Sequence, residues 1–341
     1  MKETLWLRAA EPVDITHAAT ILRQGGTVAF PTETVYGLGA NALDPAAVAN
    51  IFAAKQRPAW DPLIVHIADR AQLAEITALS EDLGERVDAL AVAFWPGPLT
   101  LLLPRSAMVP DAVTAGRALV GVRIPSHPVA QALLRGAEVP VAAPSANRFG
   151  HTSPTTAAHV LADLNGRIDA VLDGGATEVG VESTVLDPTQ TPMVLYRPGA
   201  VTADAITRAT GVAVDIYRSL ERQEIEPEAL PSPGVGIRHY APRARVVLVE
   251  GNEAAIASVL DSAGLEERVG VLLPEGWSVD ARAVAEPWGR WGDSHTMAAR
   301  LFAGLRALDD RGATVIVCPV PESGGLNDAI RDRLGKAART A

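Results

Sequence analysis

The stretch GTVAFPTETVYGLG, from Gly26 to Gly39, decides how the first half of the chain is organised. It begins with a short apolar run, Thr27–Phe30, which predicts a strand. The strand leads into the polar residues Pro31–Thr34 and then into the glycines at positions 37 and 39. Such a strand end is typical of the floor of a ligand pocket in an α/β sheet, although a plain turn explains it equally well.

Helix and strand patterns alternate irregularly around this stretch. Apolar residues spaced as on one helix face precede it, and the helix that they predict ends at Gly25 and Gly26. Asp44 and Pro45 are typical of a second helix start, and that helix should end between Lys55 and Pro58. Further short strands are expected at Leu63–Ile67, Leu99–Leu103, Leu119–Ile124, Val139–Ala143, Thr184–Leu186 and Met193–Tyr196. The irregular order predicts a twisted α/β sheet rather than a repeated βαβ array.

A second domain is predicted after a change of composition near Gly211. The charged stretch Ser219–Leu230 lacks periodicity, and a proline- and glycine-rich segment follows at residues 231–236. Regular strand and helix patterns then alternate to the end of the chain, which predicts a small doubly wound α/β domain. We therefore expect a first domain at residues 1–215, a linker at 216–243 and a second domain at 244–341.

Composition excludes several classes of protein. The 341 residues include 30 Lys and Arg against 40 Asp and Glu, a net charge of −10 that disfavours a uniformly basic nucleic-acid-binding protein. The single cysteine, Cys318, cannot form an internal disulfide or a cysteine-based zinc site. The longest uncharged run, Ala89–Pro104, is broken by prolines and too short to cross a bilayer as one helix. We expect a soluble, cytoplasmic protein.

The usual nucleotide-binding, metalloprotease and hydrolase motifs are absent, so the chemistry must come from less generic features. Lys55 and Arg57 could clamp a polyphosphate, although cations also favour a helix C-terminus for electrostatic reasons. Ser145 and Asn147 follow a strand of small residues, where a ligand pocket or a polar turn is expected. The first of these features, taken alone, is more often a plain helix end, and the second more often a plain turn.

Three further residues interrupt apolar strands or end them. Arg123 and Arg197 each end a strand, where an arginine either reaches solvent or binds an anion such as a carboxylate or phosphate. His66 lies in an apolar strand, and a histidine there is usually a structural residue with satisfied hydrogen bonds. Spacing alone leaves these alternatives open.

Taken together, these blocks resemble the threonylcarbamoyl-AMP synthases, whose catalytic unit is the YrdC-type domain. The matching blocks are Gly26–Gly39, Lys55–Pro58 with Pro62–His66, Trp95–Thr100, Val122–Pro125, Ala143–Asn147, Gly180–Thr184 and Arg197–Gly199. Ser232–Gly234 and Arg238–Pro242, followed by a Rossmann-like domain, resemble the long two-domain form of the enzyme. Asp332 stands where that form is expected to have asparagine, which concerns only the role of the second domain.

The resemblance implies that L-threonine, bicarbonate and ATP give threonylcarbamoyl-adenylate and pyrophosphate. The product would pass to the machinery that modifies the adenosine beside the anticodon of certain tRNAs, with tRNA contact possible but not required, and no membrane involved. Mg²⁺ would bind mainly through the ATP phosphates, without a dedicated protein site. Lys55 and Arg57 would stabilise the charge that develops on the leaving group.

The resemblance also assigns the binding residues. The expected L-threonine contacts are Thr34, His66, Arg123, Ala143 through its backbone, and Ser183. The expected ATP contacts are Lys55, Arg57, Ser145, Asn147, Ser153, Arg197 and Tyr240.

Two other functions are alternatives to threonylcarbamoyl-adenylate synthesis. A hydrogenase-maturation carbamoyl-transfer protein contains a similar domain, but the single cysteine excludes its zinc modules. A non-catalytic module for double-stranded RNA or tRNA is disfavoured by the net charge of −10.

Pro231–Pro242 carries Arg238, His239 and Tyr240, and we hypothesise that it closes over the pocket with Tyr240 touching ATP. The alternative is a tether whose tyrosine packs on the second domain.

Overall fold

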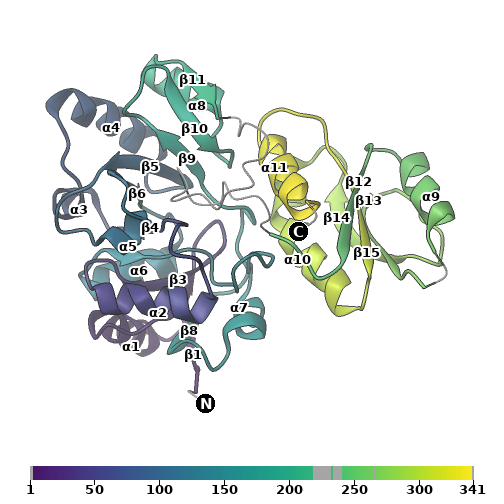
Figure 1. Cartoon of the computed structure of the whole chain (residues 1–341), viewed down its shortest axis with the longest axis horizontal. Helices are drawn as coiled ribbons and strands as arrows, with labels where there is room; N and C mark the ends of the chain where they lie inside the picture. The colour runs from purple at the N-terminus through teal and green to yellow at the C-terminus, as the bar shows by residue number, and fades with distance from the viewer. Residues whose placement is uncertain (1–2, 218–231, 233–239, 265, 340–341) are drawn as a thin grey trace. The chain divides into compact units, whose positions relative to one another are not determined.

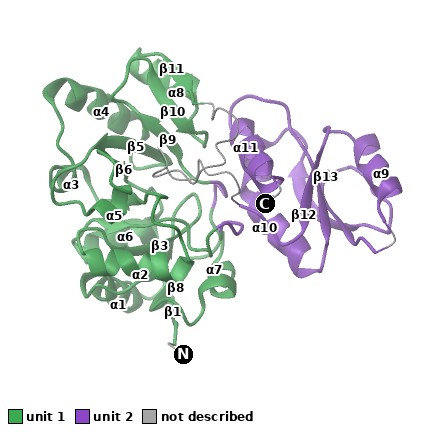
Figure 2. Cartoon of the chain, viewed as in Figure 1, with its two compact units in different colours: residues 1–149, 154–177, 182–236 green, residues 150–153, 178–181, 237–341 purple. Residues whose placement is uncertain are grey.

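The computed structural model describes residues 3–217, 232, 240–264 and 266–339. They form two compact units, which Figure 2 distinguishes by colour. The first comprises residues 1–149, 154–177 and 182–236, and the second comprises 150–153, 178–181 and 237–341. Two short segments, residues 150–153 and 178–181, therefore belong to the second unit although the residues on either side of them belong to the first. Most of the expected linker at 216–243, with Arg238 and His239, lies outside the described residues.

The first unit is built on a mixed eleven-stranded sheet, in the order β1-β8-β2-β3-β7-β4-β6-β5-β9-β10-β11. Its strands are β1 (Leu5–Arg8), β2 (Val28–Pro31), β3 (Tyr36–Asn41), β4 (Ile64–His66), β5 (Leu99–Pro104), β6 (Leu119–Arg123), β7 (Val141–Ala142), β8 (Ala170–Asp173), β9 (Thr184–Asp187), β10 (Met193–Arg197) and β11 (Val214–Ile216). Its helices are α1 (Pro12–Arg23), α2 (Pro45–Lys55), α3 (Leu73–Ile76), α4 (Glu81–Phe94), α5 (Asp111–Thr114), α6 (Pro128–Ala137), α7 (Ala157–Leu164) and α8 (Ala203–Thr210), as Figure 1 shows.

Local sequence explains the helix that leads to Lys55. The Asp44 side chain accepts a hydrogen bond from the Ala46 amide and so caps α2, with Pro45 in the first turn. The helix ends at Lys55 because Gln56 adopts a left-handed conformation, with φ of 54°. The predicted end is confirmed, but Gln56 rather than Pro58 terminates the helix.

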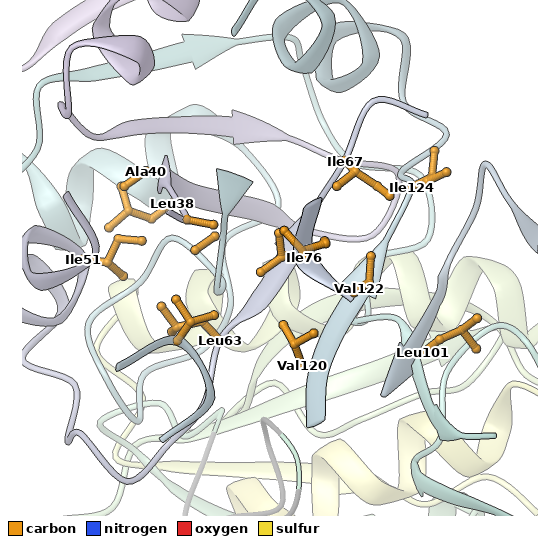
Figure 3. Packing of buried hydrophobic residues seen from close by; sticks show 14 of the residues in the cluster. Leu38, Ala40, Ile51, Leu63, Ile67, Ile76, Leu101, Val120, Val122 and Ile124 are labelled. Carbon is orange, nitrogen blue, oxygen red and sulfur yellow. The ribbon is translucent and has the colours of Figure 1, made fainter. Parts of the chain in front are cut away.

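Among the described residues of the first unit, buried side chains form two hydrophobic clusters, and successive strand residues alternate between them. Ala29 and Ala142 belong to the larger cluster, whereas Phe30 and Ala143 belong to the smaller one. Alternation of this kind places the two clusters on opposite faces of the sheet. Figure 3 shows the larger cluster, in which side chains of β3, β5 and β6 pack together.

The second unit contains a four-stranded parallel sheet in the order β12-β15-β13-β14. Its elements are β12 (Arg245–Val249), α9 (Glu253–Ser262), β13 (Val269–Glu275), β14 (Val284–Arg290), α10 (Ser294–Asp310), β15 (Val315–Pro319) and α11 (Asn327–Ala337). Figure 1 shows α9 on one side of this sheet and α10 and α11 on the other.

The prediction of a small α/β domain is confirmed. Strand β14 was not predicted, since a glutamate and a proline interrupt its apolar residues. In the described part of the chain, no helix is long and apolar enough to cross a membrane.

Candidate functional site

One edge of the large sheet brings together most of the predicted polar residues. Strands β4 and β6 run parallel and end side by side at His66 and Arg123. Strand β5 is antiparallel to β6 and so begins at this edge, and β9 runs parallel to β5. Ser183 therefore lies at the same edge, directly before β9, and antiparallel β10 ends there at Arg197.

These side chains also share one face of the sheet. Leu101 and Val122 face the larger hydrophobic cluster, so Thr100 and Arg123 face the other way. Val65 likewise faces the cluster, which places neighbouring His66 on the same face as Arg123. The polar face thus lies opposite the larger core.

A bulge adds Arg197 to that face. Strand β10 pairs Leu195 with Leu186 but Arg197 with Val185, so its register shifts by one residue. Leu195 faces the hydrophobic cluster, and an undisturbed strand would aim Arg197 there too. The extra residue turns Arg197 to the face that carries Thr100 and Arg123.

Arg123 is almost completely buried, and three neighbours hold its guanidinium group. Its Nε donates to the Gly97 carbonyl at 3.2 Å, and its Nη1 donates to Thr34 Oγ1 at 3.0 Å. Its Nη2 lies 2.7 Å from Glu33 Oε1. These two groups attract as an ion pair but are not aligned as a hydrogen bond, so neither atom has a hydrogen-bond partner. Arg123 therefore remains able to donate to an anion.

His66 lies beside Arg123 as a neutral imidazole. Burial, and then the positive charge of Arg123, lower the pKa of His66 to about 3. Its ring stands edge-on to the Phe30 ring, with the centroids 6.3 Å apart. Its buried Nδ1 atom has no hydrogen-bond partner. A neutral histidine can donate or accept one hydrogen bond to a ligand hydroxyl without adding charge.

Ser183 is held between β5 and β10. Its hydroxyl lies 2.8 Å from Thr100 Oγ1 and accepts from Arg197 Nη2 at 3.1 Å. Arg197 Nε also donates to the Ser183 carbonyl at 3.0 Å. Gly199, the last residue of the block Arg197–Gly199, lies close to the start of β9, because a Cβ there would be 2.4 Å from the Thr184 amide nitrogen. A larger residue would therefore push the two segments apart.

Lys55 connects the end of α2 with the segment after β7. Its Nζ donates to the carbonyls of Ser145 and Asn147, at 2.6 and 2.5 Å. Burial, and then the charge of Arg57, hold the pKa of Lys55 well below its usual range. The negative charges of Asp61 and Asp163 act in the opposite direction on this pKa. An incoming phosphate would favour the charged form further.

Ser145 and Ala143 lie where the segment after β7 crosses β3 and β4. Ser145 forms an isolated bridge with Gly37, and the Ala143 amide donates to the Ile64 carbonyl at 2.8 Å. Ala143 therefore lies beside the start of β4, two residues from His66. A Cβ on Gly37 would approach Ala143 Cβ at 3.3 Å, so small residues let the segments lie close.

Arg57 is buried and its guanidinium group is fixed by three contacts. Its Nε donates to the Asp61 carbonyl at 3.1 Å, and its Nη2 donates to the Pro62 carbonyl at 2.7 Å. Its Nη2 also lies 2.9 Å from Asp61 Oδ2. Burial raises the pKa of Asp61, while the charges of Arg57, Lys55 and Arg197 act in the opposite direction. The positive charges of Arg57 and Arg197 together exceed the negative charge of the Asp61 carboxylate. The net charge of this cluster is therefore positive, which favours the binding of anions.

Two predicted ATP contacts, Ser153 and Tyr240, belong to the second unit. Ser153 is fully buried. The Tyr240 ring is also buried and stacks on the Phe302 ring, with the centroids 5.5 Å apart. The Arg333 guanidinium carbon lies 5.3 Å from the Tyr240 ring centroid. This packing matches the tether alternative for the tyrosine, and its contact with ATP remains a prediction.

Glu33 and Asp61 were missed as candidate site residues. Glu33 lies within the block Gly26–Gly39, and Asp61 lies directly before the block Pro62–His66. Each carboxylate has a buried oxygen without a hydrogen-bond partner. Their sign of charge could have indicated them, because both lie within a few residues of positions expected to bind substrate. Their pairing with Arg123 and Arg57 depends on the fold.

The described residues contain no group of three or more side chains that could hold a metal ion. Asp61 Oδ1 offers one oxygen ligand beside the cation cluster. A Mg²⁺ ion that is held mainly by nucleotide phosphates would need few protein ligands.

Comparisons with known proteins agree along both halves of the chain. A family model described as telomere recombination matches residues 20–199, and one described as threonylcarbamoyl-AMP synthase, C-terminal domain, matches residues 201–339. The threonylcarbamoyl-AMP synthase of Pyrococcus abyssi is 43% identical over 326 residues, covering 94% of this chain and 93% of the relative. That of Bacillus subtilis is 43% identical over 330 residues, covering 95% and 92%.

A solved structure supports the same conclusion. The crystal structure of Pyrococcus abyssi Sua5 complexed with L-threonine is 42% identical, with a TM-score of 0.87, and the match covers 98% of this chain and 97% of that one. Identity and coverage of this extent include both α/β units. The chain therefore belongs to the threonylcarbamoyl-AMP synthase family, in its two-domain form.

Proposed function

We propose that this chain joins L-threonine, bicarbonate and ATP into threonylcarbamoyl-adenylate at the polar face of the large sheet. The observation that carries this proposal is the position of Arg197. It donates to Ser183 at one side, and its charge acts on the Asp61 carboxyl group within the Lys55 and Arg57 cluster at the other. A site for an amino acid thus adjoins a site for phosphates.

In the proposed binding of threonine, the substrate contacts the guanidinium N–H groups of Arg123 and the polar side chains around it. Arg123 would bind the substrate carboxylate, since a guanidinium group can donate two parallel hydrogen bonds to it. Thr34 and Ser183 flank Arg123 and Arg197 and offer hydroxyl groups. Neutral His66 would contact the threonine hydroxyl, and the Ala143 backbone would complete the pocket.

The proposed binding of ATP uses the cations on the other side of Arg197. Lys55, Arg57 and Arg197 would contact the phosphates, with Ser145 and Asn147 beside Lys55. Ser153 and Tyr240 remain predicted ATP contacts.

The chemistry requires positioning more than a covalent nucleophile. Bicarbonate takes up a proton and supplies CO₂ by losing water, and the threonine nitrogen, which has lost a proton as the free amine, forms a bond to its carbon and releases a second proton to give a carbamate. A carbamate oxygen then attacks the α-phosphorus, and the bond between this phosphorus and the departing pyrophosphate breaks. Lys55 and Arg57 would stabilise the negative charge that develops on the departing pyrophosphate. Passage of the product to a tRNA-modifying transferase, in the cytoplasm, completes the proposal.

The test measures pyrophosphate release with ATP, bicarbonate and each of the amino acids in turn. We expect release that requires both L-threonine and bicarbonate, and a product with the mass of threonylcarbamoyl-adenylate. Orthophosphate as the main product, or release that does not depend on threonine, would refute the proposed function. Salt-dependent RNA binding without pyrophosphate release would favour the non-catalytic alternative.

A further inference from the structure

Glu33 is a buried carboxylate that the proposed reaction does not yet use. It is 5% exposed and lies in the loop between β2 and β3, next to Thr34. Both of its carboxylate oxygens are buried without a hydrogen-bond partner, although Oε1 lies 2.7 Å from Arg123 Nη2. The ion pair with Arg123 offsets part of the cost of burying this charge, but Oε2 has neither an ion-pair contact nor a hydrogen bond. A buried oxygen in that state is unfavourable unless a protein group, a water molecule or a ligand donates to it.

The loop around Glu33 is held in place by its own hydrogen bonds. Thr32 Oγ1 accepts from the Thr34 amide at 3.2 Å and donates to the Val35 carbonyl at 2.7 Å. Thr32 and Thr34 also join their hydroxyls at 2.8 Å. These bonds satisfy the polar groups on either side of Glu33 and leave its carboxylate as the exception.

The charges of Glu33 and Arg123 match those of an amino acid. An amino acid zwitterion carries a carboxylate and an ammonium group on one carbon atom, so a cation and an anion that lie side by side complement its charges. Arg123 supplies the cation, and its Nη1 and Nη2 atoms have N–H groups beyond those that contact Thr34 and Glu33. A substrate carboxylate on Arg123 would therefore place its ammonium group beside the free oxygen of Glu33.

We propose that Glu33 accepts a hydrogen bond from the amino nitrogen of threonine. It thereby selects threonine over hydroxy acids that lack the amino group. This inference rests on the proposed placement of threonine on Arg123. The contact suits each stage of the reaction, since the ammonium group, the free amine and the carbamate N–H can all donate to a carboxylate. Glu33 is thus a specificity-determining residue whose role is distinct from that of Arg123.

The experiment compares L-threonine with (R)-3-hydroxybutanoate, which is threonine without its amino group. Affinities of both are measured by calorimetry for the full-length wild-type protein and for Glu33→Gln. Hydrogen bonds to charged groups predict that Glu33→Gln weakens threonine binding by about tenfold to a hundredfold. Binding of (R)-3-hydroxybutanoate should change by less than about threefold, because it has no nitrogen to lose a contact.

Asp187→Asn is the matched control. Asp187 is a buried carboxylate at the far end of β9, where it accepts from Thr189 and Gln190. The Asp187→Asn substitution should leave the ratio of the threonine and (R)-3-hydroxybutanoate affinities unchanged, even if it lowers stability. Thermal unfolding of each variant reports whether the fold is retained, and Glu33→Asp, which keeps the charge, should recover part of the selectivity.

Three outcomes would overturn the proposal. Equal weakening of both ligands would mean that Glu33 only supports Arg123, and unchanged affinities would mean that it contacts neither ligand. Tighter threonine binding by Glu33→Gln would mean that Glu33 competes with the substrate for Arg123. Arg123→Ala tests the underlying placement separately, since it should weaken both ligands whether or not Glu33 contacts nitrogen.

Discussion

Arg57 and Asp61 form a buried ion pair, with Arg57 Nη2 2.9 Å from Asp61 Oδ2 and both side chains under 5% exposed. Removing one partner of such a pair leaves an uncompensated charge in the interior, which costs about 3–5 kcal/mol of stability. A loss of ATP binding in Arg57→Ala could therefore come from altered folding as well as from a missing phosphate contact. A variant that lacks the charge of Arg57 and also that of Asp61 separates the two effects.

Arg57→Met combined with Asp61→Asn should fold more stably than Arg57→Ala yet bind ATP at least about tenfold more weakly than wild type. Loss of one charge-assisted hydrogen bond to a phosphate accounts for a change of that size. Urea unfolding and ATP titration measure the two properties separately. Wild-type ATP affinity in the double variant would show that Arg57 has only a structural role.

Arg123→Ala should mainly weaken threonine, by roughly thirtyfold to a thousandfold, with a smaller effect on ATP. The loss of a bidentate contact between a buried arginine and a carboxylate costs about 2–4 kcal/mol. Direct titration of each substrate distinguishes the two effects. A threonine affinity within about twofold of wild type would contradict the assignment.

His66 should make stability depend on pH. Its pKa is about 3 in the folded protein, below the value near 6.5 expected in the unfolded chain, so the unfolded state binds the proton more tightly. The unfolding free energy should rise with pH between these values, and wild type should lose about 2 kcal/mol from this group between pH 7 and pH 5.

Urea unfolding at both pH values tests this dependence. His66→Gln should lose less stability on acidification than wild type does, since it cannot take up the proton. Exposed His17, changed to Gln, is the control and should follow wild type. An unchanged pH dependence in His66→Gln would mean that the histidine is not held neutral.

Gly199→Ala should disturb Ser183 and Arg197 without removing either. Its Cβ would meet the Thr184 amide nitrogen at 2.4 Å, and overpacking of this kind costs about 1–3 kcal/mol. We expect a lower unfolding free energy and a weaker threonine affinity. Gly84→Ala in α4 is the control, because nothing lies within 4 Å of the added atom and alanine favours a helix by about 1 kcal/mol.

Tyr240 can be tested for its two proposed roles at once. Tyr240→Phe keeps the ring that stacks on Phe302, whereas Tyr240→Ala removes it and should cost about 3–5 kcal/mol. If the hydroxyl contacts ATP, Tyr240→Phe should weaken ATP binding, and it should lower stability much less than Tyr240→Ala does. Normal ATP affinity in Tyr240→Phe would leave the tyrosine with a packing role alone.

The sequence by itself determined much of this protein. Asp44 and Pro45 start a helix through local hydrogen bonding and a fixed φ angle, and short apolar runs form buried strands, so these elements could be predicted from neighbouring residues. The blocks around Thr34, Lys55, Arg123 and Ser183 also identified the family, because they occur together and in one order. The predicted change to a separate α/β domain has the same local origin.

Only the tertiary structure decided how these residues combine. Thr34 and Arg123 are 89 positions apart, and their contact depends on strand order, which hydrophobic periodicity does not encode. The face to which Arg197 turns depends on a bulge in its pairing with β9, and alternation alone would have placed it in the core. The burial of Glu33 likewise arises from packing between distant segments, which brings this carboxylate of the predicted pocket floor beside Arg123.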